Sequence, residues 1–399
     1  MFDLNNNKPQ TGEKRSVYLD HSATTPVDPS VAEVVKRTML EQWGNPSSKY
    51  RIGNDAKIVL ERAREQVAAL INAKPEHMFF TSGGTEADNL AIIGAMNAAR
   101  AAGRGDHFIT DAIEHSAVLK AAEALEEDGF KVTILPVTPD GFVDPDTLRN
   151  AMTDQTALVS IMQVNNEIGT IQPLDQLVAV ARERGALFHT DAVQGFGKLP
   201  LDVQTLPVDL VSVSSHKIYG PKGVGALYIR AGVELSSRQF GGGQEKGVRT
   251  GTENMPGIAG FGAAALLCSE KMVDDAKRIG ELRDKFLAWI KAEVDGEVIV
   301  NGGLENRIYL NLNLQFPGVE ADSLLLALDL DGVAISIGSA CSSGSTNPSH
   351  VLTALGLNGE QANASIRVTL GRSNSAEDLL YSAQMIGKHV KRLREMAVW

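Results

Sequence analysis

The chain has 399 residues, more than one hydrophobic core usually supports, so we expect two domains. Hydrophobic residues make up 43% and charged residues 22% of the chain, proportions that are typical of a globular protein and exclude a disordered one. The net charge of −11 and the lack of a long uninterrupted apolar stretch disfavour nucleic acid and membranes as partners.

The N-terminal residues 1–16 are polar and lack the apolar core of a signal peptide. We predict a partly disordered tail there and a cytoplasmic location for the protein. Only two cysteines occur, so the chain can build neither a disulfide framework nor a multi-cysteine metal site, and we expect no bound metal. Cys268 lies in an alanine-rich helical run that is typical of a buried thiol. Cys341 lies among Ser, Gly, Asn and Pro, a composition typical of an exposed loop, where a thiol is either incidental or reactive.

Short apolar runs alternate with helical patterns between residues 17 and 229. Strands are predicted at HMFFTSG, HFITDAI, KVTILPV, ALVSIMQV, ALFHTDAV and LVSVSSH, and helices at TEADNLAIIGAMNAARAAG and LDQLVAVARERGA. This alternation favours a mostly parallel sheet flanked by helices on both faces, with ligands bound beyond the carboxyl ends of the strands.

A long helix is predicted from Met255 to about Glu293. It leads into a smaller α+β unit made of EVIVNGG, RIYLNLNL, EADSLLLALDL, GVAIS, SIRVTLG and a C-terminal helix. We therefore predict a large domain over residues 17–262 and a small C-terminal domain over residues 263–399.

Three polar elements follow predicted strands of the large domain. Lys217 comes after LVSVSSH, and Asp191 ends LFHTD with Gln194 within the next turn. A carboxylate and a lysine at neighbouring strand ends can hold the pyridinium nitrogen of pyridoxal phosphate and form a Schiff base with it. A solvated surface lysine or an ordinary buried ion pair is the alternative.

The second element is TSGGTEADN, a strand, a glycine turn and a helix start that together can bind a phosphate. It is neither a Walker loop nor a GxGxxG motif, and it could equally be a capped helix start with Thr85 near the cap. His115, the third element, directly follows a strand and is either structural or a ring that stacks on a pyridine and moves protons.

Ten motifs occur in order along the chain, namely YLDHSATTPVDP, GNPSS, TSGGTEADN, EHSAV, VNNEIGTIQP, HTDAVQ, SSHKIYGPKG, GGGQEKGVRTGTEN, GSACSSGS and SIRVTLGR. Taken together, they resemble the motifs of the NifS/IscS-type cysteine desulfurases, which are class V members of the fold-type I pyridoxal-phosphate enzymes. The resemblance extends from about residue 17 to the C-terminal helix. It implies the fold-type I architecture, with a mostly parallel seven-stranded sheet in the large domain, and pyridoxal 5'-phosphate as the cofactor.

The resemblance also implies a role for each matching residue. Lys217 would bind the cofactor covalently and remove the α-proton of the substrate, and His115 would stack on the ring and take the thiol proton. Asp191 would hold the ring nitrogen and Gln194 the phenolic oxygen. The remaining matches are Gly84, Thr85, Ser214 and His216 for the phosphate, Thr252 from the neighbouring subunit of a homodimer, and Asn166 and Arg367 for the substrate carboxylate.

Cys341 would then accept sulfur from L-cysteine as a persulfide, leaving L-alanine, and would deliver the sulfur to an acceptor protein such as one in iron–sulfur cluster assembly. Three alternatives remain open: a selenocysteine lyase, a class V aminotransferase in which Cys341 has no role, and a non-catalytic subunit that has kept the fold. Comparing rates on cysteine and selenocysteine, testing for transamination in Cys341→Ala, and testing for a cofactor absorption band that Lys217→Ala loses would separate them.

Overall fold

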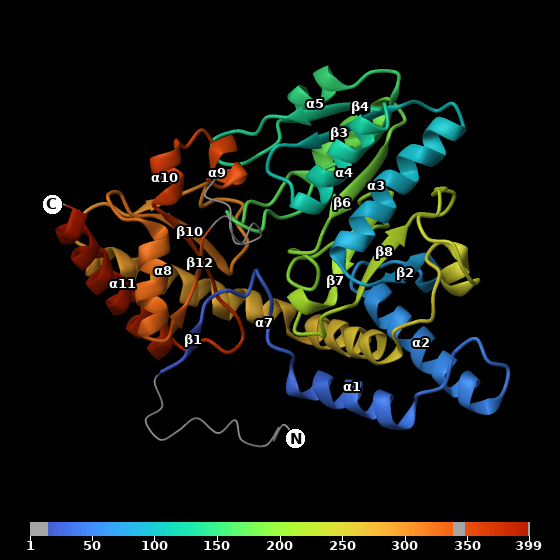
Figure 1. Ribbon diagram of the computed structural model, residues 1–399, viewed down its shortest axis with the longest axis horizontal. Coiled ribbons are helices and arrows are strands. Elements are labelled where there is room, and N and C mark those ends of the chain that lie inside the picture. The colour runs from blue at the N-terminus through green and yellow to red at the C-terminus, as the bar shows by residue number, and fades with distance from the viewer. Residues whose placement is uncertain (1–14, 338–347, 398–399) are drawn as a thin grey trace.

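The computed structural model describes residues 15–337 and 348–397. Its larger part is a seven-stranded sheet with helices on both faces, and its smaller part contains a four-stranded sheet covered by helices (Figure 1). The α/β architecture with a smaller α+β unit, predicted from the sequence, is therefore confirmed.

The seven strands of the large sheet lie in the order β2-β8-β7-β6-β5-β3-β4. Strands β3 to β7 pair in parallel, whereas β8 lies between β2 and β7 and is antiparallel to both. The strands are β2 (Met78–Thr81), β3 (His107–Asp111), β4 (Lys131–Leu135), β5 (Thr156–Ser160), β6 (Leu187–Asp191), β7 (Leu210–Ser214) and β8 (Gly225–Ile229).

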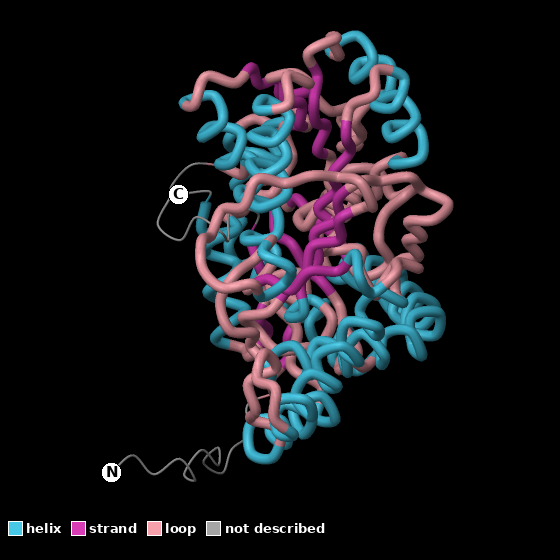
Figure 2. Tube along the Cα trace, turned by 90° about the vertical axis from the view of Figure 1, so that its right-hand side faces the viewer, coloured by secondary structure: helices cyan, strands magenta, loops and turns pink. Residues whose placement is uncertain are grey.

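Alternating side chains along these strands build two hydrophobic cores, one on each face of the sheet. Phe108 and Leu158 pack on the face that α3 (Gly84–Ala101) and α4 (Ser116–Glu127) cover, while their neighbours Ile109 and Val159 pack on the opposite face. The helices on that opposite face are α1 (Pro29–Glu41), α2 (Arg51–Ala69), α5 (Pro145–Ala151), α6 (Leu174–Glu183) and the first half of α7 (Met255–Glu293). Figure 2 shows the strands running between helices.

The long helix α7 connects the two parts of the molecule, packing against α1 and α2 in the large part and against α11 (Ala376–Ala397) in the small part (Figure 1). The sheet of the small part has the order β12-β13-β10-β9. The strands of this sheet are β9 (Ile299–Val300), β10 (Asn311–Gln315), β12 (Ser336–Ile337) and β13 (Ser365–Thr369), and the small part also contains the helices α8 (Ala321–Leu330), α9 (His350–Ala354) and α10 (Gly359–Asn363).

The start of the chain lies in the small part. Strand β1 (Val17–Tyr18) pairs in parallel with β11 (Val333–Ala334), and Val17 and Leu19 belong to the core of the small part. The division into residues 17–262 and 263–399 remains a prediction, but the structure places residues 17–19 with the second core rather than the first. Local sequence could not show this, because it depends on pairing between segments more than 300 residues apart.

Within the described ranges, none of the helices has the length and apolar character that crossing a lipid bilayer requires.

Candidate functional site

A cavity of about 310 Å³ opens where the carboxyl ends of the large sheet face the small part. Most of the residues singled out in the sequence line it, although they come from six different segments of the chain. These are Gly84, Thr85, His115, Asn166, Asp191, Gln194, Ser214, His216, Lys217 and Arg367. The structure therefore brings together ten residues that the sequence spreads over nearly 300 positions.

Of the predicted site residues that the structure describes, Thr252 does not line this cavity. Thr252 is exposed on the surface, beside a separate hollow that Met39 and Trp43 also line. Cys341 lies outside the described residues.

The glycine turn before α3 fits a phosphate group. Gly84 begins this helix, and a Cβ atom there would approach Val193 Cγ2 to 2.8 Å, so only glycine leaves the space open. The buried Ser214 hydroxyl, which also lines the cavity, has no hydrogen-bond partner. A helix N-terminus, a space that a side chain would fill and an unsatisfied hydroxyl together suit an anion with several acceptor oxygens.

Asp191 ends β6 and is buried inside the cavity. Its Oδ1 accepts a hydrogen bond from the Val193 backbone N–H at 2.8 Å, which fixes the carboxylate at the strand end. Burial raises the pKa of Asp191, and this is opposed by His115, by the Val193 hydrogen bond and by Lys217. A cationic ring nitrogen would compensate this burial, which is what the expected pyridine cofactor offers.

His115 is the N-cap of α4, and its Nδ1 accepts the Ala117 backbone N–H at 3.1 Å. Burial lowers the pKa of His115, so the ring is neutral near pH 7 and carries its proton on Nε2. In this orientation the ring can donate a hydrogen bond from Nε2, whereas taking up another proton would break the hydrogen bond with Ala117.

Lys217 ends the short helix η2 (Ser215–Lys217) that follows β7. Its Nζ donates hydrogen bonds of 2.6 Å to the carbonyl oxygens of Ser22 and Ala23. The Gln194 side chain reaches the same segment, because its Nε2 donates to the Ser22 carbonyl at 3.0 Å. The DHSATTP segment thus forms a wall of the cavity.

A second amine lies behind this wall. Lys198 is buried, and its Nζ donates to the Gln194 carbonyl oxygen at 3.0 Å. Burial, followed by repulsion from Lys217, lowers the pKa of Lys198 to about 7. Lys198 therefore adds less positive charge to this region at neutral pH than an exposed lysine would.

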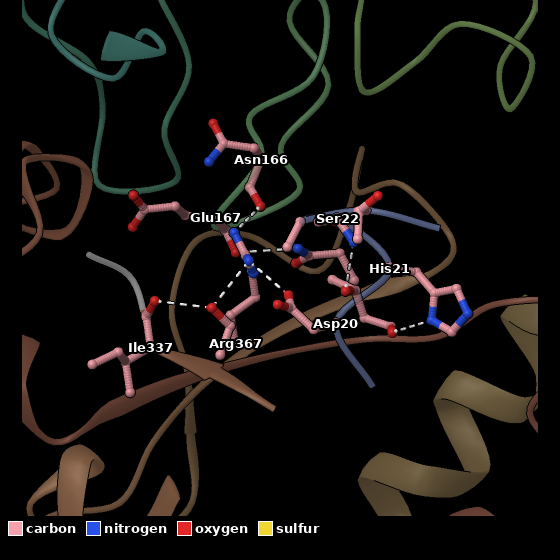
Figure 3. Close-up of polar contacts among 12 residues, drawn as sticks. Asp20, His21, Ser22, Asn166, Glu167, Ile337 and Arg367 are labelled. Atoms are coloured by element: carbon pink, nitrogen blue, oxygen red, sulfur yellow. Dashed lines mark hydrogen bonds and ion pairs between the residues drawn. The ribbon is translucent and has the colours of Figure 1, made fainter. Parts of the chain in front are cut away.

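Arg367 points from β13 into the cavity and is held on three sides (Figure 3). Its Nη2 contacts Asp20 Oδ1 at 2.7 Å and Ser336 Oγ at 3.1 Å, and its Nη1 donates to the Asn166 carbonyl at 3.1 Å. The buried Nε has no partner. The guanidinium is therefore fixed in orientation and keeps a donor for an anionic ligand.

On either side of residues 338–347, which include Cys341, the described chain is anchored beside Arg367 and the neighbouring Glu167. Before these residues, Ser336 in β12 hydrogen-bonds Arg367. After them, Ser349 Oγ donates to the buried Glu167 at 2.6 Å, and burial raises the pKa of this carboxyl group to about 7. Glu167 follows Asn166 in the chain, so both anchors lie next to groups that line the cavity.

The glycine-rich segment over residues 241–252, which ends at Thr252, is held by a buried ion pair between Arg64 and Glu245. Both Nη atoms of Arg64 contact the Glu245 carboxylate at 2.8 Å, and the Phe80 N–H donates to the same carboxylate at 2.8 Å. Glu245 and Lys246 have positive φ angles of 44° and 55°, which turn the chain sharply there. This network sets the course of the glycine-rich stretch before Thr252.

Sequence reasoning missed several residues of the cavity and its border. Backbone carbonyl groups and partners from distant segments leave no local signal in the sequence. Asp88 did leave one, because it follows Gly84 by one helical turn, and this spacing places both residues on the same face of the helix. The missed residues are Asp20, Ser22, Ala23, Asp88, Met162, Val193 and Glu167.

Comparison with known proteins identifies a family that matches most of the chain. The family model Aminotransferase class-V matches residues 17–381. A protein named Cysteine desulfurase IscS from Dictyoglomus turgidum is 47% identical over 384 residues, covering 96% of this chain and 97% of the relative. One with the same name from Methylococcus capsulatus is 47% identical over 387 residues, covering 96% and 94%.

Solved structures of related proteins share the fold of this chain. One described as a NifS-like protein superposes with a TM-score of 0.89 and 35% identity, covering 95% of this chain and all of that chain. Another, described as SspA in complex with cysteine, has a TM-score of 0.80 and 36% identity and covers 89% of this chain and 99% of its own.

Proposed function

We propose that the cavity converts L-cysteine to L-alanine and that Cys341 receives the sulfur. The proposal starts from the family, because the chain belongs to the class-V aminotransferases and is a cysteine desulfurase that depends on pyridoxal phosphate. The observation that carries this proposal is the convergence of Lys217, Asp191, His115 and Arg367 on one cavity. A non-catalytic subunit would not need a lysine, a buried carboxylate and an oriented arginine at the same strand ends.

The residues of the cavity fit the cofactor. Gly84, Thr85, Ser214 and His216 would hold its phosphate, with Asp191 at the ring nitrogen. Gln194 would contact the phenolic oxygen, and Lys217 would be the point of covalent attachment. When bound, pyridoxal phosphate supplies an electron sink that makes the α-proton and the sulfur of the substrate labile.

Arg367 and Asn166 bind the substrate carboxylate in this proposal. Arg367 is already oriented by Asp20, Ser336 and the Asn166 carbonyl, so little side-chain entropy is lost when the substrate binds. The structure solved with bound cysteine, which is 36% identical, supports an amino-acid substrate of this size.

Lys217 acts as the base that takes the α-proton, since its Nζ lies in the cavity and contacts the wall formed by Ser22 and Ala23. His115 provides a stacking surface and an Nε2–H donor. The neutral form of its ring, with Nδ1 occupied by Ala117, favours donation over a role as the acceptor of the thiol proton.

Sulfur transfer balances without an external oxidant. The Cys341 thiolate attacks the substrate sulfur, a sulfur–sulfur bond forms, and the carbon–sulfur bond of L-cysteine breaks. The electron pair of the broken bond stays with the substrate, whose β-carbon takes up one proton, equal in number to the proton that the Cys341 thiol gave up, so that L-alanine and a Cys341 persulfide are the products. The anchors at Ser336 and Ser349, on either side of the segment that carries Cys341, support its delivery to this cavity.

The function is tested by measuring L-alanine and sulfide formed by the cofactor-loaded protein from L-cysteine in the presence of a reductant. We expect one L-alanine for each sulfide released and a comparable or lower rate with L-selenocysteine. Activity confined to selenocysteine would instead identify a selenocysteine lyase.

Arg367→Lys is expected to reduce kcat/KM for L-cysteine by about 10–100-fold, mainly through KM, because lysine cannot reproduce the oriented fork of donors. Cysteamine, which lacks the carboxylate, should bind the variant as well as it binds the unaltered protein. Arg392→Lys, an exposed change on α11, is the matched control. Equal losses for cysteine and cysteamine would contradict the assignment of Arg367 to the carboxylate.

The proposal includes a homodimer. Met39, Leu40 and Trp43 at the end of α1 and Phe240 near the glycine-rich stretch are large apolar side chains exposed by 60–92%. Thr252 lies beside this apolar area, in the same hollow as Met39 and Trp43. A large apolar surface of this kind favours association, and Thr252 would there reach the phosphate site of the partner subunit.

Mixed dimers test the contribution of Thr252. Thr252→Val is expected to weaken cofactor retention by roughly tenfold, because it removes one hydrogen bond to the phosphate. A statistical mixture with Lys217→Ala should recover about a quarter of normal activity at limiting cofactor, since half of the dimers then contain one site with both Lys217 and Thr252. No recovery on mixing would place Thr252 in its own subunit's site or outside the site altogether.

We also propose that the sulfur passes to an acceptor protein, with iron–sulfur cluster assembly as the leading pathway, because the curated relatives carry the IscS name. A cytoplasmic location fits a chain that must keep a reactive thiol reduced. Detecting labelled sulfur on a candidate acceptor after incubation with labelled L-cysteine would identify the partner.

A further inference from the structure

Asp88 is a cavity residue with no role in the mechanism described above. It lies one turn into α3 and is 1% exposed, and its Oδ1 has no hydrogen-bond partner. One side-chain atom each from Asp88, His115 and Asp191 lie within 4.8 Å of one another. Asp88 is therefore a second buried carboxyl group beside the one proposed to hold the ring nitrogen of the cofactor.

His189, the basic side chain that contacts Asp88 among the residues the structure describes, does not compensate its charge. His189 Nε2 lies 3.7 Å from its Oδ1, but both ring nitrogens of His189 already contact serine hydroxyls, Nδ1 that of Ser160 at 2.8 Å and Nε2 that of Ser212 at 2.9 Å. Burial lowers the pKa of His189 to about 3, so this ring is neutral. The other titratable groups facing Asp88 are Asp191 on β6 and Glu114 and His115 after β3.

The two carboxyl groups are not equivalent. Asp191 accepts the Val193 N–H at 2.8 Å and is attracted by the positive charge of Lys217, both of which favour its ionised form. Among the residues that the structure describes, Asp88 receives such help from the Ser212 hydroxyl alone. Two buried carboxylates this close cannot both be ionised without a large electrostatic penalty, so a shared proton goes to the less stabilised one. Burial first, and then Asp191, accordingly raise the pKa of Asp88 well above its usual value.

We propose that Asp88 is held as a neutral carboxylic acid and thereby leaves Asp191 as the only anion facing the ring nitrogen. This proposal rests on the function proposed above, because it assigns Asp88 a positioning role at the cofactor. A single negative charge matches a single protonated ring nitrogen. A second ionised carboxylate would add uncompensated charge in a buried site and would change the affinity of the ring nitrogen for its proton.

The direct test is the infrared spectrum of the cofactor-loaded dimer at neutral pH, with the spectrum of Asp88→Asn subtracted from that of the unaltered protein. Asparagine has nearly the shape of a neutral carboxylic acid, so the variant should fold. We expect the difference to contain the carbonyl-stretch band of a protonated acid, shifted in heavy water. A difference that shows only carboxylate bands would overturn the proposal. Asp88→Ser removes the same acid and provides the same readout should the asparagine variant fold poorly.

The visible absorption band of the bound cofactor supplies a second readout. Because asparagine replaces a neutral group by a neutral group, the pH at which this band changes should stay within about 0.3 units. Asp88→Leu, which cannot bond the Ser212 hydroxyl, should lose at least roughly tenfold in kcat/KM. A shift of about one pH unit or more in Asp88→Asn would mean that a charge has been removed and would contradict the proposal.

Asp191→Asn separates this inference from the function on which it depends. If Asp191 holds the ring nitrogen, this variant changes the cofactor band strongly. An unchanged band would refute the role of Asp191 at the cofactor, whereas the infrared result on Asp88 reports its protonation independently of any catalytic activity.

Discussion

Replacing Cys341 by alanine is expected to reduce sulfide release from L-cysteine to background while the visible band of the bound cofactor is unchanged. The reason is that the substrate sulfur then has no thiolate to attack it, although the lysine, carboxylate and arginine of the cavity are all intact. The measurement is L-alanine and sulfide formation in the presence of a reductant, together with mass analysis of the protein after incubation with L-cysteine alone. The unaltered protein should gain the mass of one sulfur atom for each reactive thiol.

Cys268→Ala is the matched control for this experiment. Cys268 is 1% exposed on α7, and burial raises the pKa of its thiol, so it is neither accessible nor easily ionised. The variant should keep its activity and still form a persulfide on the remaining cysteine. Full activity in Cys341→Ala would eliminate the persulfide route and favour a lyase that releases sulfur or selenium without a protein thiol.

Lys217→Ala is expected to lower kcat for L-alanine formation by about 10⁴-fold or more, since it removes both the covalent attachment of the cofactor and the general base. The yellow band of the attached cofactor should disappear at the same time. The fold should persist, because Lys217 lines the cavity and is not part of the hydrophobic core of the large part.

An exposed lysine near Lys217 serves as the matched control for the Lys217→Ala variant. Lys222 lies in the turn that leads to β8 and is exposed, so Lys222→Ala changes the charge of the same region without altering the cavity. It should retain the band and the activity within about twofold. A Lys217→Ala protein that kept a normal band and normal turnover would refute the assignment of this lysine.

Strand–helix alternation was sufficient to predict the large sheet, because its buried strands are short, apolar and separated by helices with a clear period. The predicted runs HFITDAI, KVTILPV and LVSVSSH correspond to β3, β4 and β7, and the long helix from Met255 to Glu293 was predicted within its observed limits. Strand β8 was not predicted separately. It follows β7 after a short connection, which forces an antiparallel pairing that the alternation rule does not describe.

The site was predictable where one short segment carries both a side chain and its structural context. Lys217 and Asp191 both follow apolar runs, and Gly84 lies in a turn that precedes a helix. Contacts formed by tertiary packing were not predictable. The ion pair of Arg367 with Asp20 joins positions 347 residues apart, and neither residue signals the other in the sequence.

The placement of β1 has a consequence for the order in which the protein can assemble during synthesis. By the time residue 230 has been made, all seven strands of the large sheet exist and can pair. The first strand must still wait for Val333 and Ala334, and Asp20 must wait for Arg367. A growing chain can therefore form the part of the cavity that contains Lys217 long before the part that contains Arg367. A chain released early would keep the proposed phosphate site at Gly84 but would lack Arg367, the residue proposed to bind the substrate carboxylate.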